Sequence, residues 1–447
     1  MKYFGTDGFR GEANIDLNVN HAFKIGRFLG DYFKKQNKDS KIVIGKDTRR
    51  SSYMFESALA AGITSSGSDA YLLHVTTTPS VSYITRTEDF DCGIMISASH
   101  NPYYDNGIKL IGGDGYKLEG DILEEIEKYI DSEEDTIPLA KGENIGRTVD
   151  YLVGRNRYIA YLATVVTKSF KGIKVLVDAS NGAAYQISKN VFDILGADVD
   201  MINDRPDGYN INKDAGSTHI ENLAEKVVEG KYDLGIAYDG DADRCLAVDE
   251  NGNIISGDHI MYIFGKYLRD IGELNKNIVV TTVMSNLGLY KTLESQNIEY
   301  IQTPVGDKYV SEEIRQNGYS VGGEQSGHII LSKYATTGDG ILTSLKLIEI
   351  MVKSKSSLSL LAKELKIYPQ LLENLRITDK NIVLNDEDVQ KSIKEVEETL
   401  KDSGRILVRP SGTEPLIRVM IEAETDEICK ENVEKVVKVI KEKGYLK

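Results

Sequence analysis

The segment D-G-D-A-D-R at 239–244 carries the residues whose types and spacing most strongly suggest chemistry. Asp239, Asp241 and Asp243 alternate along a turn that follows the apolar segment L-G-I-A-Y. Carboxylates spaced in this way can direct oxygen ligands at one hard divalent cation. An EF-hand calcium loop is disfavoured, because Arg244 stands where its sharp turn needs glycine and because the flanking segments predict strands. An unliganded acidic turn is also disfavoured, since bunched carboxylates repel one another unless they are neutralised.

The segment S-A-S-H-N-P at 97–102 places two hydroxyl groups beside an imidazole, again directly after an apolar, strand-like segment. A serine in such a loop can serve as a nucleophile or phosphoryl carrier if a neighbouring group activates it. A plain turn explains the same residues equally well, because Ser, Asn and Pro are common in turns. Lys109 follows ten residues after Ser99 and could return to the same site. The G-x-S-x-G pattern is absent from this segment, which weakens a hydrolase triad.

The segment R-P-S-G-T-E-P at 409–415 has the composition of an anion-binding turn. Backbone N–H groups at a glycine turn, two hydroxyl groups and a guanidinium group suit phosphate oxygens. Arg418 follows three residues after the segment and could add a second cation. The alternative is a hairpin turn with incidental hydroxyl groups.

Two further segments, G-E-Q-S-G-H at 323–328 and G-T-D-G-F-R-G at 5–11, combine glycines with polar side chains. The first offers a carboxylate, an amide, a hydroxyl and an imidazole, a set that can bind the hydroxyl groups of a sugar. His328 by itself would more often be structural. The second places glycines around Arg10 but fits neither the dinucleotide-binding pattern nor the P-loop pattern. An irregular turn explains the second segment as well as a functional role does.

Three segments that could position these loops share one pattern of strand, turn, helix and strand, at 41–73, 174–202 and 277–303. Each has about 30 residues, the size of a βαβ unit, and predicts parallel strands covered on both faces. Each is followed by a short apolar strand that ends in one polar loop: the serine loop, the acidic loop and the G-E-Q-S-G-H loop in turn. Because ligands gather outside the carboxyl ends of such strands, we expect all three loops to be functional.

The C-terminal part of the chain has a different pattern. From about residue 368 it shows two strands joined by a Pro/Gly turn, with helix-like runs at 386–401 and 427–443. This pattern predicts a small α+β domain. The predicted fold class is therefore α/β, with three related α/β domains of mixed, mostly parallel sheets and a smaller C-terminal α+β domain. The expected domains are 1–152, 153–254, 255–367 and 368–447.

Composition restricts the partners. The 447 residues include 54 Lys and Arg against 69 Asp and Glu, a formal net charge of −15. This balance argues against nucleic acid as a partner and against electrostatic attachment to an anionic membrane. No apolar run approaches the roughly 20 residues of a membrane helix, and the first residues lack the apolar stretch of a signal peptide. Three widely spaced cysteines predict a reduced, cytoplasmic protein without disulfides or a zinc cluster.

Taken together, the loops make the chain resemble the α-D-phosphohexomutase family along its whole length. That family has a phosphoserine loop, a three-aspartate metal loop, a sugar-binding G-E-x-S loop and a C-terminal phosphate loop, and all four occur here in that order. The resemblance implies four domains arranged around a central cleft, with the C-terminal domain as a mobile lid. Two departures stand out. Lys308 replaces an arginine in a G-D-R-Y-V loop, and R-R-S-S-Y-M at 49–54 replaces a form with glycine after the serine.

The resemblance also implies a role for each matching residue. Ser99 would be the phosphorylated residue, and Lys109 and His328 would be the general acid/base candidates. The three aspartates of the acidic loop would bind Mg²⁺ together with an oxygen of phosphorylated Ser99. Further residues would contact the substrate or the transferred group: Arg10, His100 and Arg244 near the phosphoryl group, Glu324 and Ser326 at sugar hydroxyls, Arg409, Ser411, Gly412 and Thr413 at the other phosphate, and Lys308 and Arg418 as additional cations.

The implied reaction has two phosphoryl transfers. Phosphorylated Ser99 gives its group to O1 of glucosamine 6-phosphate, and Ser99 then takes a group back from O6 of the 1,6-bisphosphate, leaving glucosamine 1-phosphate. The amino sugar is expected because the loops are most similar to those of family members that act on glucosamine phosphates and feed UDP-N-acetylglucosamine and cell-wall precursor synthesis. Glucose or mannose phosphate is the alternative substrate. A hexose 1,6-bisphosphate would be the activator, and a homodimer is left open as the assembly.

Two alternatives lie outside this family. A haloacid-dehalogenase-type phosphatase would use an aspartate of the acidic loop as the nucleophile, and it would carry a labile acyl phosphate instead of an acid-stable phosphoserine. A metal-dependent regulator would bind a sugar phosphate without turning it over. Neither alternative accounts for all of the loops.

Overall fold

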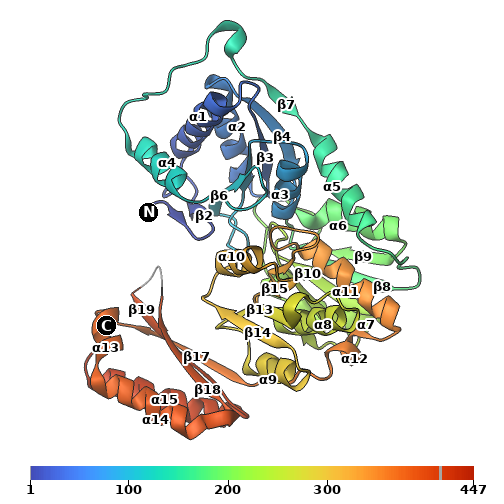
Figure 1. The fold of residues 1–447 in the computed structure, drawn as a ribbon, viewed down its shortest axis with the longest axis vertical. Helices are drawn as coiled ribbons and strands as arrows, with labels where there is room; N and C mark the ends of the chain where they lie inside the picture. The colour runs from blue at the N-terminus through green and yellow to red at the C-terminus, as the bar shows by residue number, and fades with distance from the viewer. Residues whose placement is uncertain (1, 412–414, 447) are drawn as a thin grey trace. The chain divides into compact units, whose positions relative to one another are not determined.

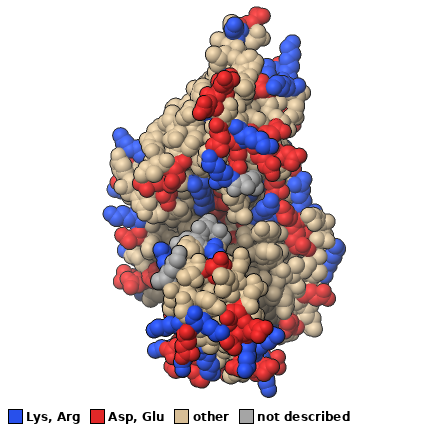
Figure 2. Space-filling view, turned by 90° about the vertical axis from the view of Figure 1, so that its left-hand side faces the viewer, with Lys and Arg blue, Asp and Glu red and all other residues tan. Residues whose placement is uncertain are grey.

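The computed structural model describes residues 2–411 and 415–446, and the chain divides into two compact units (Figure 1). The first unit comprises the chain up to Met284 together with Ile298–Lys363, and the second comprises Ser285–Asn297 with the chain from Glu364 onward. Within the described residues, no helix is long and apolar enough to span a membrane. Figure 2 shows basic and acidic side chains interspersed over one face of the molecule.

A seven-stranded mixed sheet forms the N-terminal part of the first unit. Its strands are β1 (Phe4–Gly5), β2 (Gly8–Glu12), β3 (Lys41–Lys46), β4 (Asp69–Val75), β5 (Cys92–Ile96), β6 (Asp105–Gly112) and β7 (Thr148–Asp150). Their spatial order is β1-β2-β6-β5-β3-β4-β7. β5, β3, β4 and β7 run parallel. Beyond β5, β6 pairs antiparallel with β5, and β2 pairs antiparallel with β6.

Helices cover both faces of this first sheet. They are α1 (Val19–Gln36), α2 (Arg50–Ser65), α3 (Thr78–Thr87) and α4 (Asp121–Asp131), followed by the 3₁₀ helix η1 (Gly142–Asn144). Successive residues of β3 face opposite sides, because Ile42 and Ile44 join the core under α1, α2 and α4, while Val43 joins the core under α3. α1 and α2 pack closely because Gly62 has no side chain: a Cβ there would lie 2.3 Å from the carbonyl oxygen of Phe23.

Two smaller sheets follow in the first unit, in the orders β12-β11-β10-β8-β9 and β14-β13-β15-β16. Their strands are β8 (Lys174–Asp178), β9 (Asp198–Ile202), β10 (Leu234–Tyr238), β11 (Cys245–Asp249), β12 (Ile254–Ile255), β13 (Ile278–Thr282), β14 (Glu299–Thr303), β15 (Val321–Gly323) and β16 (Ile329–Leu331). The accompanying helices are α5 (Leu152–Thr164), α6 (Ala184–Leu195), η2 (Gly216–Thr218), α7 (Glu221–Gly230), α8 (Gly257–Asp270), η3 (Asn275–Asn277), α10 (Asp307–Asn317), α11 (Gly340–Ser354) and α12 (Leu358–Ala362).

One topology recurs in the three sheets and confirms the predicted repeats. A strand, a helix and a parallel strand occur as β3-α2-β4, β8-α6-β9 and β13-α9-β14, where α9 is Leu287–Ser295. The next strand, β5, β10 or β15, pairs parallel with the first strand on its other side. β6, β11 and β16 then return antiparallel. Each polar loop therefore lies at the carboxyl end of a parallel strand, where ligands bind in sheets of this kind.

The second unit contains the predicted C-terminal α+β fold. Its antiparallel sheet has the order β17-β19-β18, formed by β17 (Gln370–Arg376), β18 (Arg405–Pro410) and β19 (Leu416–Glu422). Its other helices are α13 (Lys380–Asn385), α14 (Glu387–Leu400), η4 (Lys401–Ser403) and α15 (Asp426–Glu442). The buried Glu422 ties α9 to this sheet, because it accepts hydrogen bonds from Leu287 N at 2.8 Å and from Arg405 Nε at 2.7 Å.

The predicted fold class is thus confirmed, with three related α/β sheets and a smaller α+β fold. The sequence pattern indicated two strands at the C-terminal end, and the structure adds β17 as a third. The expected domain boundaries and the arrangement around a central cleft stay predictions.

Candidate active site

The serine loop connects β5 to β6 and holds Ser99 in a left-handed backbone conformation, with a φ of 51°. Residues with side chains rarely adopt this conformation, so the surrounding contacts must stabilise it. The buried Ser99 hydroxyl donates a hydrogen bond to Asp239 Oδ2 at 2.5 Å. The Ser99 N–H donates to Ser97 Oγ at 2.9 Å. The loop therefore directs the Ser99 hydroxyl at the acidic loop, while Ser97 supports the backbone.

The acidic loop follows β10 and brings its three carboxylates together. One potential ligand atom from each of Asp239, Asp241 and Asp243 lies within 4.8 Å of the others, and all three residues are buried. Oδ1 of Asp241 and Oδ1 of Asp243 have no hydrogen-bond partner among the described residues. Burial, reinforced by the other two carboxylates, raises the pKa of Asp239 well above its ordinary value. These features fit a divalent cation, which would ligate the free oxygens and neutralise the clustered charge.

Lys109 on β6 compensates part of this negative charge. Its Nζ lies 2.7 Å from Asp241 Oδ2, 3.1 Å from Asp243 Oδ2 and 3.4 Å from Asp7 Oδ2. Burial alone would lower the pKa of Lys109, but these carboxylates raise it well above its ordinary value. Burial would likewise raise the pKa of Asp243, yet the positive charge of Lys109 leads the effects that lower it. Lys109 is therefore an ammonium group in this arrangement.

Arg10, His100 and Arg244 surround the same loop with further nitrogen donors. Arg244 Nη1 lies 3.1 Å from His100 Nδ1, and the Arg244 N–H donates to Asp239 Oδ1 at 3.2 Å. Burial, followed by the charges of Arg244 and Arg10, lowers the pKa of His100 to about 4, so its ring is neutral near pH 7. Arg10 forms an ion pair with Asp7, and its buried Nε has no partner among the described residues. A guanidinium group with an unused donor suits a phosphoryl group.

The G-E-Q-S-G-H loop connects β15 to β16 in the same unit. Glu324 Oε1 accepts a hydrogen bond from Gly306 N at 3.1 Å, and the charge of Glu324 also contributes to raising the pKa of Arg244 after those of Asp239 and Asp243. Among the described residues, Ser326 Oγ and both ring nitrogens of His328 are buried without hydrogen-bond partners. Because buried polar atoms are usually paired, these atoms indicate a polar ligand.

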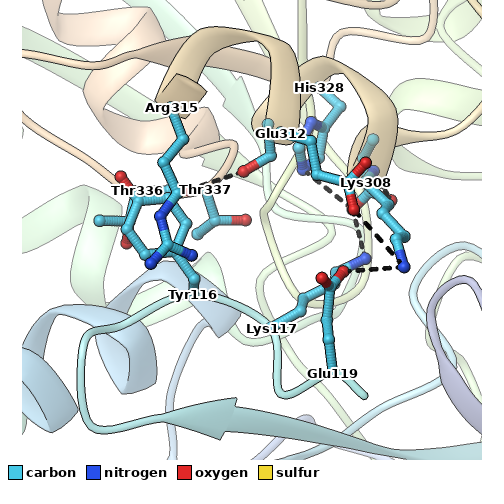
Figure 3. A pocket seen from close by; sticks show the side chains of 11 residues that line it. Tyr116, Lys117, Glu119, Lys308, Glu312, Arg315, His328, Thr336 and Thr337 are labelled. Atoms are coloured by element: carbon cyan, nitrogen blue, oxygen red, sulfur yellow. Dashed lines mark hydrogen bonds and ion pairs between the residues drawn. The ribbon is translucent and has the colours of Figure 1, made fainter. Parts of the chain in front are cut away.

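A pocket beside His328 is lined by side chains of α10 and of the loop after β6 (Figure 3). Lys308 reaches across it to Glu119, with Nζ 3.0 Å from Oε1, and lies 3.6 Å from Glu312 Oε1. The ion pair with Glu119 is visible as a dashed line in Figure 3. The predicted role of Lys308 toward the substrate therefore requires it to leave these carboxylates, and that role stays a prediction.

Several residues in these contacts carried no recognisable sequence signal. Lys117 Nζ lies 2.6 Å from Asp7 Oδ1 and 2.5 Å from Asp307 Oδ2, and so links the first sheet to α10. Asp307 Oδ2 also lies 3.5 Å from His328 Nε2. Thr78, in the first turn of α3, donates its N–H to the Asp241 carbonyl oxygen at 3.0 Å and its hydroxyl to the Asp241 carboxylate. Only the G-D-K-Y-V segment that contains Asp307 could have suggested one of them.

The remaining predicted site residues belong to the second unit. Arg409 on β18 and Arg418 on β19 are cross-strand partners. Burial, and then the charge of Arg418, lowers the pKa of Arg409. Because two adjacent guanidinium groups repel each other, the pair favours an anion as a shared partner. Ser411 is buried, and Gly412 and Thr413 lie outside the described residues.

Within the first unit, one connected set of contacts brings together the predicted residues Ser99, His100, Arg244, Asp239, Asp241, Asp243, Lys109 and Arg10. Such a set can hold a cation and a phosphoryl group next to a serine hydroxyl, which is the equipment of a phosphoryl-transfer enzyme.

Four phosphoglucomutase/phosphomannomutase domain families match the chain in sequence order. The α/β/α domains I, II and III match residues 1–136, 156–252 and 256–368, and the C-terminal domain matches residues 372–439. The chain therefore belongs to the phosphoglucomutase/phosphomannomutase family, as its loops predicted, and it is a phosphosugar mutase, an isomerase.

Its curated relatives narrow the similarity to one kind of mutase. The phosphoglucosamine mutase of Lachnoclostridium phytofermentans is 61% identical over 446 residues, covering 100% of this chain and 99% of the relative. The phosphoglucosamine mutase of Lachnospira eligens is 62% identical, covering 99% of each chain. That of Anoxybacillus flavithermus is 52% identical over 99% of each chain.

Solved structures confirm the fold. A phosphoglucomutase/phosphomannomutase family protein from Burkholderia thailandensis has a TM-score of 0.81 at 22% identity, covering 98% of this chain and 97% of its own. The N-acetylphosphoglucosamine mutase of Aspergillus fumigatus, solved with GlcNAc-6P and magnesium, has a TM-score of 0.72 at 18% identity, covering 99% and 96%.

Proposed function

We propose that this chain interconverts glucosamine 6-phosphate and glucosamine 1-phosphate through a phosphoserine at Ser99 and a 1,6-bisphosphate intermediate. The observation that carries the proposal is the 2.5 Å hydrogen bond from Ser99 Oγ to Asp239 Oδ2, within a buried set of carboxylates and cations. The names of the curated relatives supply the amino sugar. The product would feed UDP-N-acetylglucosamine and cell-wall precursor synthesis.

Asp239, Asp241 and Asp243 would hold a Mg²⁺ ion together with an oxygen of phosphorylated Ser99. The bound ion supplies Lewis-acid neutralisation of the phosphoryl charge. Oδ1 of Asp241 and Oδ1 of Asp243, which accept no hydrogen bond within the described part of the chain, support this assignment, because Mg²⁺ binds through a few carboxylates and substrate phosphate oxygens. Phosphorylated Ser99 has no hydroxyl proton, so its hydrogen bond to Asp239 belongs to the unphosphorylated protein.

In the first transfer, the sugar O1 attacks the phosphorus atom on Ser99 while the bond from phosphorus to Ser99 Oγ breaks. The O1 proton must pass to a base, and Ser99 Oγ must receive a proton. His328 fits the base, since both of its ring nitrogens lack hydrogen-bond partners in the described part of the chain. Lys109 fits the acid, since Asp241 and Asp243 hold it as an ammonium group. His100 stays neutral and positions Arg244 toward the transferred group.

In the second transfer, Ser99 Oγ attacks the phosphorus atom of the 6-phosphate while the bond from that phosphorus to O6 breaks. Ser99 Oγ returns its proton to Lys109, and O6 takes its proton from His328 and leaves as a hydroxyl. The phosphate that does not react needs a site of its own during both transfers. We assign this site to the C-terminal loop, with Arg409, Arg418, Ser411, Gly412 and Thr413. This loop would act as a lid that limits attack by water and escape of the bisphosphate.

Glu324 and Ser326 would bind hydroxyl groups of the sugar, and Lys308 would add a cation once it leaves Glu119. A hexose 1,6-bisphosphate would activate the enzyme by phosphorylating Ser99. The three cysteines are buried and free, which is in keeping with the reducing cytoplasm. A homodimer is the assembly to be tested by light scattering.

A substrate panel tests the proposed function. Mutase activity should be measured with Mg²⁺ and a catalytic amount of glucose 1,6-bisphosphate on glucosamine, glucose and mannose 6-phosphates. We expect the highest kcat/KM for glucosamine 6-phosphate and a lower value for glucose 6-phosphate. A preference of about tenfold or more for glucose or mannose phosphate would rule out the amino-sugar assignment. A labile acyl phosphate on an aspartate, in place of an acid-stable phosphoserine, would rule out the mechanism.

A further inference from the structure

We propose that Arg49 is a positioning residue that fixes the backbone of the serine loop, so that the Ser99 hydroxyl meets the acidic loop, and that Ser52 supports Arg49 through Asp47. Arg49 takes this role on the premise that Ser99 carries the phosphoryl group, as in the proposed function. Neither Arg49 nor Ser52 belongs to the contacts described for the site above.

Arg49 immediately precedes α2 and has an exposed fraction of 0%. Its Nη2 donates hydrogen bonds to the carbonyl oxygens of Ser99 and Asn101, each at 2.9 Å, and its Nη1 donates to that of Pro102. One guanidinium group therefore serves three carbonyl groups within four consecutive residues. A guanidinium group can do this because it presents its donors in a rigid plane, which the single ammonium group of lysine cannot reproduce.

The Ser99 carbonyl oxygen is held from a second direction as well. Asn212 Nδ2 donates to it at 2.8 Å, and Gly240 approaches so closely that a Cβ there would lie 2.5 Å from it. Because Ser99 has a left-handed backbone with a φ of 51°, these contacts hold a conformation that the residue would not adopt alone. With its carbonyl oxygen held by Arg49 and Asn212, Ser99 directs its hydroxyl group at Asp239.

Asp47 orients the guanidinium plane. Its Oδ2 accepts from Arg49 Nε at 2.8 Å, and its Oδ1 accepts from Arg49 N at 2.9 Å and from the Ser52 hydroxyl at 2.8 Å. Ser52 Oγ accepts in turn from Asn106 Nδ2 at 3.0 Å. Ser52 occupies the position at which the family resemblance places glycine, so this chain has a hydroxyl group there that the glycine form lacks.

The residues on either side of Arg49 bond to loops that follow strands of the second sheet. Thr48 Oγ1 donates to the Asn181 carbonyl oxygen at 2.6 Å, and Arg50 N donates to the Gly208 carbonyl oxygen at 3.1 Å. The second sheet also carries the acidic loop, so the segment around Arg49 contacts both the serine loop and the sheet from which the acidic loop extends. Phosphoryl transfer depends on alignment, and a displacement of about 1 Å can cost on the order of a hundredfold in rate.

Arg49→Lys tests the role, because it keeps the positive charge beside Asp47 and removes the planar set of donors. We expect kcat to fall about tenfold or more while KM for glucosamine 6-phosphate changes less than about twofold, since loop alignment rather than sugar binding is altered. Transfer from glucose 1,6-bisphosphate to dephosphorylated Ser99, followed by intact-protein mass spectrometry, should slow by a similar factor. Wild-type kcat and transfer rate in folded Arg49→Lys would overturn the proposal.

Arg27→Lys is the matched control. Arg27 also has an exposed fraction of 0%, donates from Nε to Asp135 at 3.2 Å and from Nη1 to the Ser65 carbonyl oxygen at 3.2 Å, but it serves no residue of the serine loop. Arg27→Lys should lower the melting temperature comparably and leave kcat within about twofold of wild type. An equal loss of kcat in both variants would mean that Arg49 acts only on general stability, which would overturn the proposal.

Ser52→Ala provides a second measurement that leaves the pair of Arg49 and Asp47 intact. It should lower kcat about two- to fivefold with KM unchanged. If Arg49→Lys does not fold, Ser52→Ala becomes the test, and an unchanged kcat in that variant would overturn the proposal.

Ser99→Ala separates this proposal from the proposed function. Activity that is independent of Ser99 would overturn both, whereas loss of activity in Ser99→Ala with full activity in Arg49→Lys would overturn only the role of Arg49.

Discussion

At the scale of single residues, the orientation of the hydroxyl group distinguishes two serines that look alike in the sequence. Ser97 and Ser99 flank one alanine in the serine loop, and both are buried. Ser97 Oγ accepts the Ser99 N–H, so it faces the interior of its own loop. Ser99 Oγ instead donates to Asp239, beside the carboxylates that fit a cation. A phosphoryl carrier needs an oxygen that faces the cation site, and Ser99 meets this requirement.

Substitution of each serine by alanine should therefore have different effects. Ser99→Ala removes the proposed phosphoryl carrier and should lower kcat on the order of a thousandfold or more, with normal folding. Ser97→Ala leaves the Ser99 N–H without its acceptor and should cost about 1–3 kcal/mol of stability with a milder loss of kcat. Intact-protein and peptide mass spectrometry should find one phosphate on the wild type, at Ser99. Phosphate at Ser97, or near-wild-type turnover in Ser99→Ala, would contradict the assignment.

The site residues that the sequence predicted stand in local patterns. Asp239, Asp241 and Asp243 are recognisable because three carboxylates alternate in one turn, and the structure places them together. Lys117 and its contact with Asp307 could not be predicted in the same way, because Lys117 stands in no recognisable local pattern and the 2.5 Å contact arises from packing between the first sheet and α10. Short-range spacing carries information on loops, whereas contacts between sheets depend on tertiary structure.

At the scale of elements, the strands explain why the loops can be located from the sequence alone. β3, β8 and β13 are short apolar runs followed by helical periodicity, which predicts βαβ units with little ambiguity. β17 was not predicted as a strand because its sequence, Q-L-L-E-N-L-R, mixes polar and apolar residues and much of its surface stays exposed. Its side chains therefore show no clear apolar alternation.

The acidic loop should behave as one element in metal binding. Asp239→Asn, Asp241→Asn and Asp243→Asn should each lower kcat about a hundredfold or more. Combining two of these substitutions should lower kcat little further, because each one already removes the same site. Chelation should abolish activity and Mg²⁺ should restore it, while Zn²⁺, which prefers nitrogen and sulfur donors, should support less. Asp200→Asn on β9 is the control and should keep wild-type kinetics. Full activity in excess chelator would rule out the metal site.

Glu349 on helix α11 should contribute measurably to the pH dependence of the free energy of unfolding in acid. Glu349 accepts hydrogen bonds from Thr167 N at 2.8 Å and Thr167 Oγ1 at 2.6 Å, and from Lys346 Nζ at 2.9 Å. Burial would raise its pKa, but these bonds lower it from 4.5 to about 2. A carboxyl group with a lowered folded-state pKa contributes stability above pH 4.5, and this contribution is lost as the pH falls toward 2.

Glu349→Gln should therefore reduce the free energy of unfolding by about 1–3 kcal/mol at pH 7 and by progressively less below pH 4.5. The difference between variant and wild type, measured by urea unfolding at several pH values, isolates this group from other acid-sensitive residues. Glu225→Gln on α7 replaces an exposed glutamate and should change stability little at any pH. A difference that stays constant from pH 7 to pH 3 would contradict the prediction.

At the scale of the whole molecule, a chain with a net charge of −15 must bind a doubly charged sugar phosphate. Local cations have to overcome the overall repulsion, and the structure buries Lys109 against the acidic loop and places the half-buried side chain of Arg244 beside it. Arg409 and Arg418 form a second cationic pair in the C-terminal unit. The four matched domain families agree with the presence of separate cationic sites, because each matched domain contains a polar loop of its own.

Substitutions at the two cationic sites should have different kinetic effects, because the bisphosphate intermediate has two phosphates and only one reacts at a time. Arg409→Ala removes a charge-assisted contact of about 1.5–3 kcal/mol and should raise KM about ten- to a hundredfold for glucosamine 6-phosphate and glucosamine 1-phosphate alike. It should also increase release of the bisphosphate and leave Ser99 phosphorylated. Glu324→Ala should instead alter the ratio of kcat/KM between glucosamine and glucose phosphates. Lys394→Ala, which removes an exposed cation on α14, is the control and should change neither KM nor this ratio. The role of the C-terminal loop is wrong if Arg409→Ala leaves every sugar phosphate unaffected, since an unreactive phosphate would then be held elsewhere.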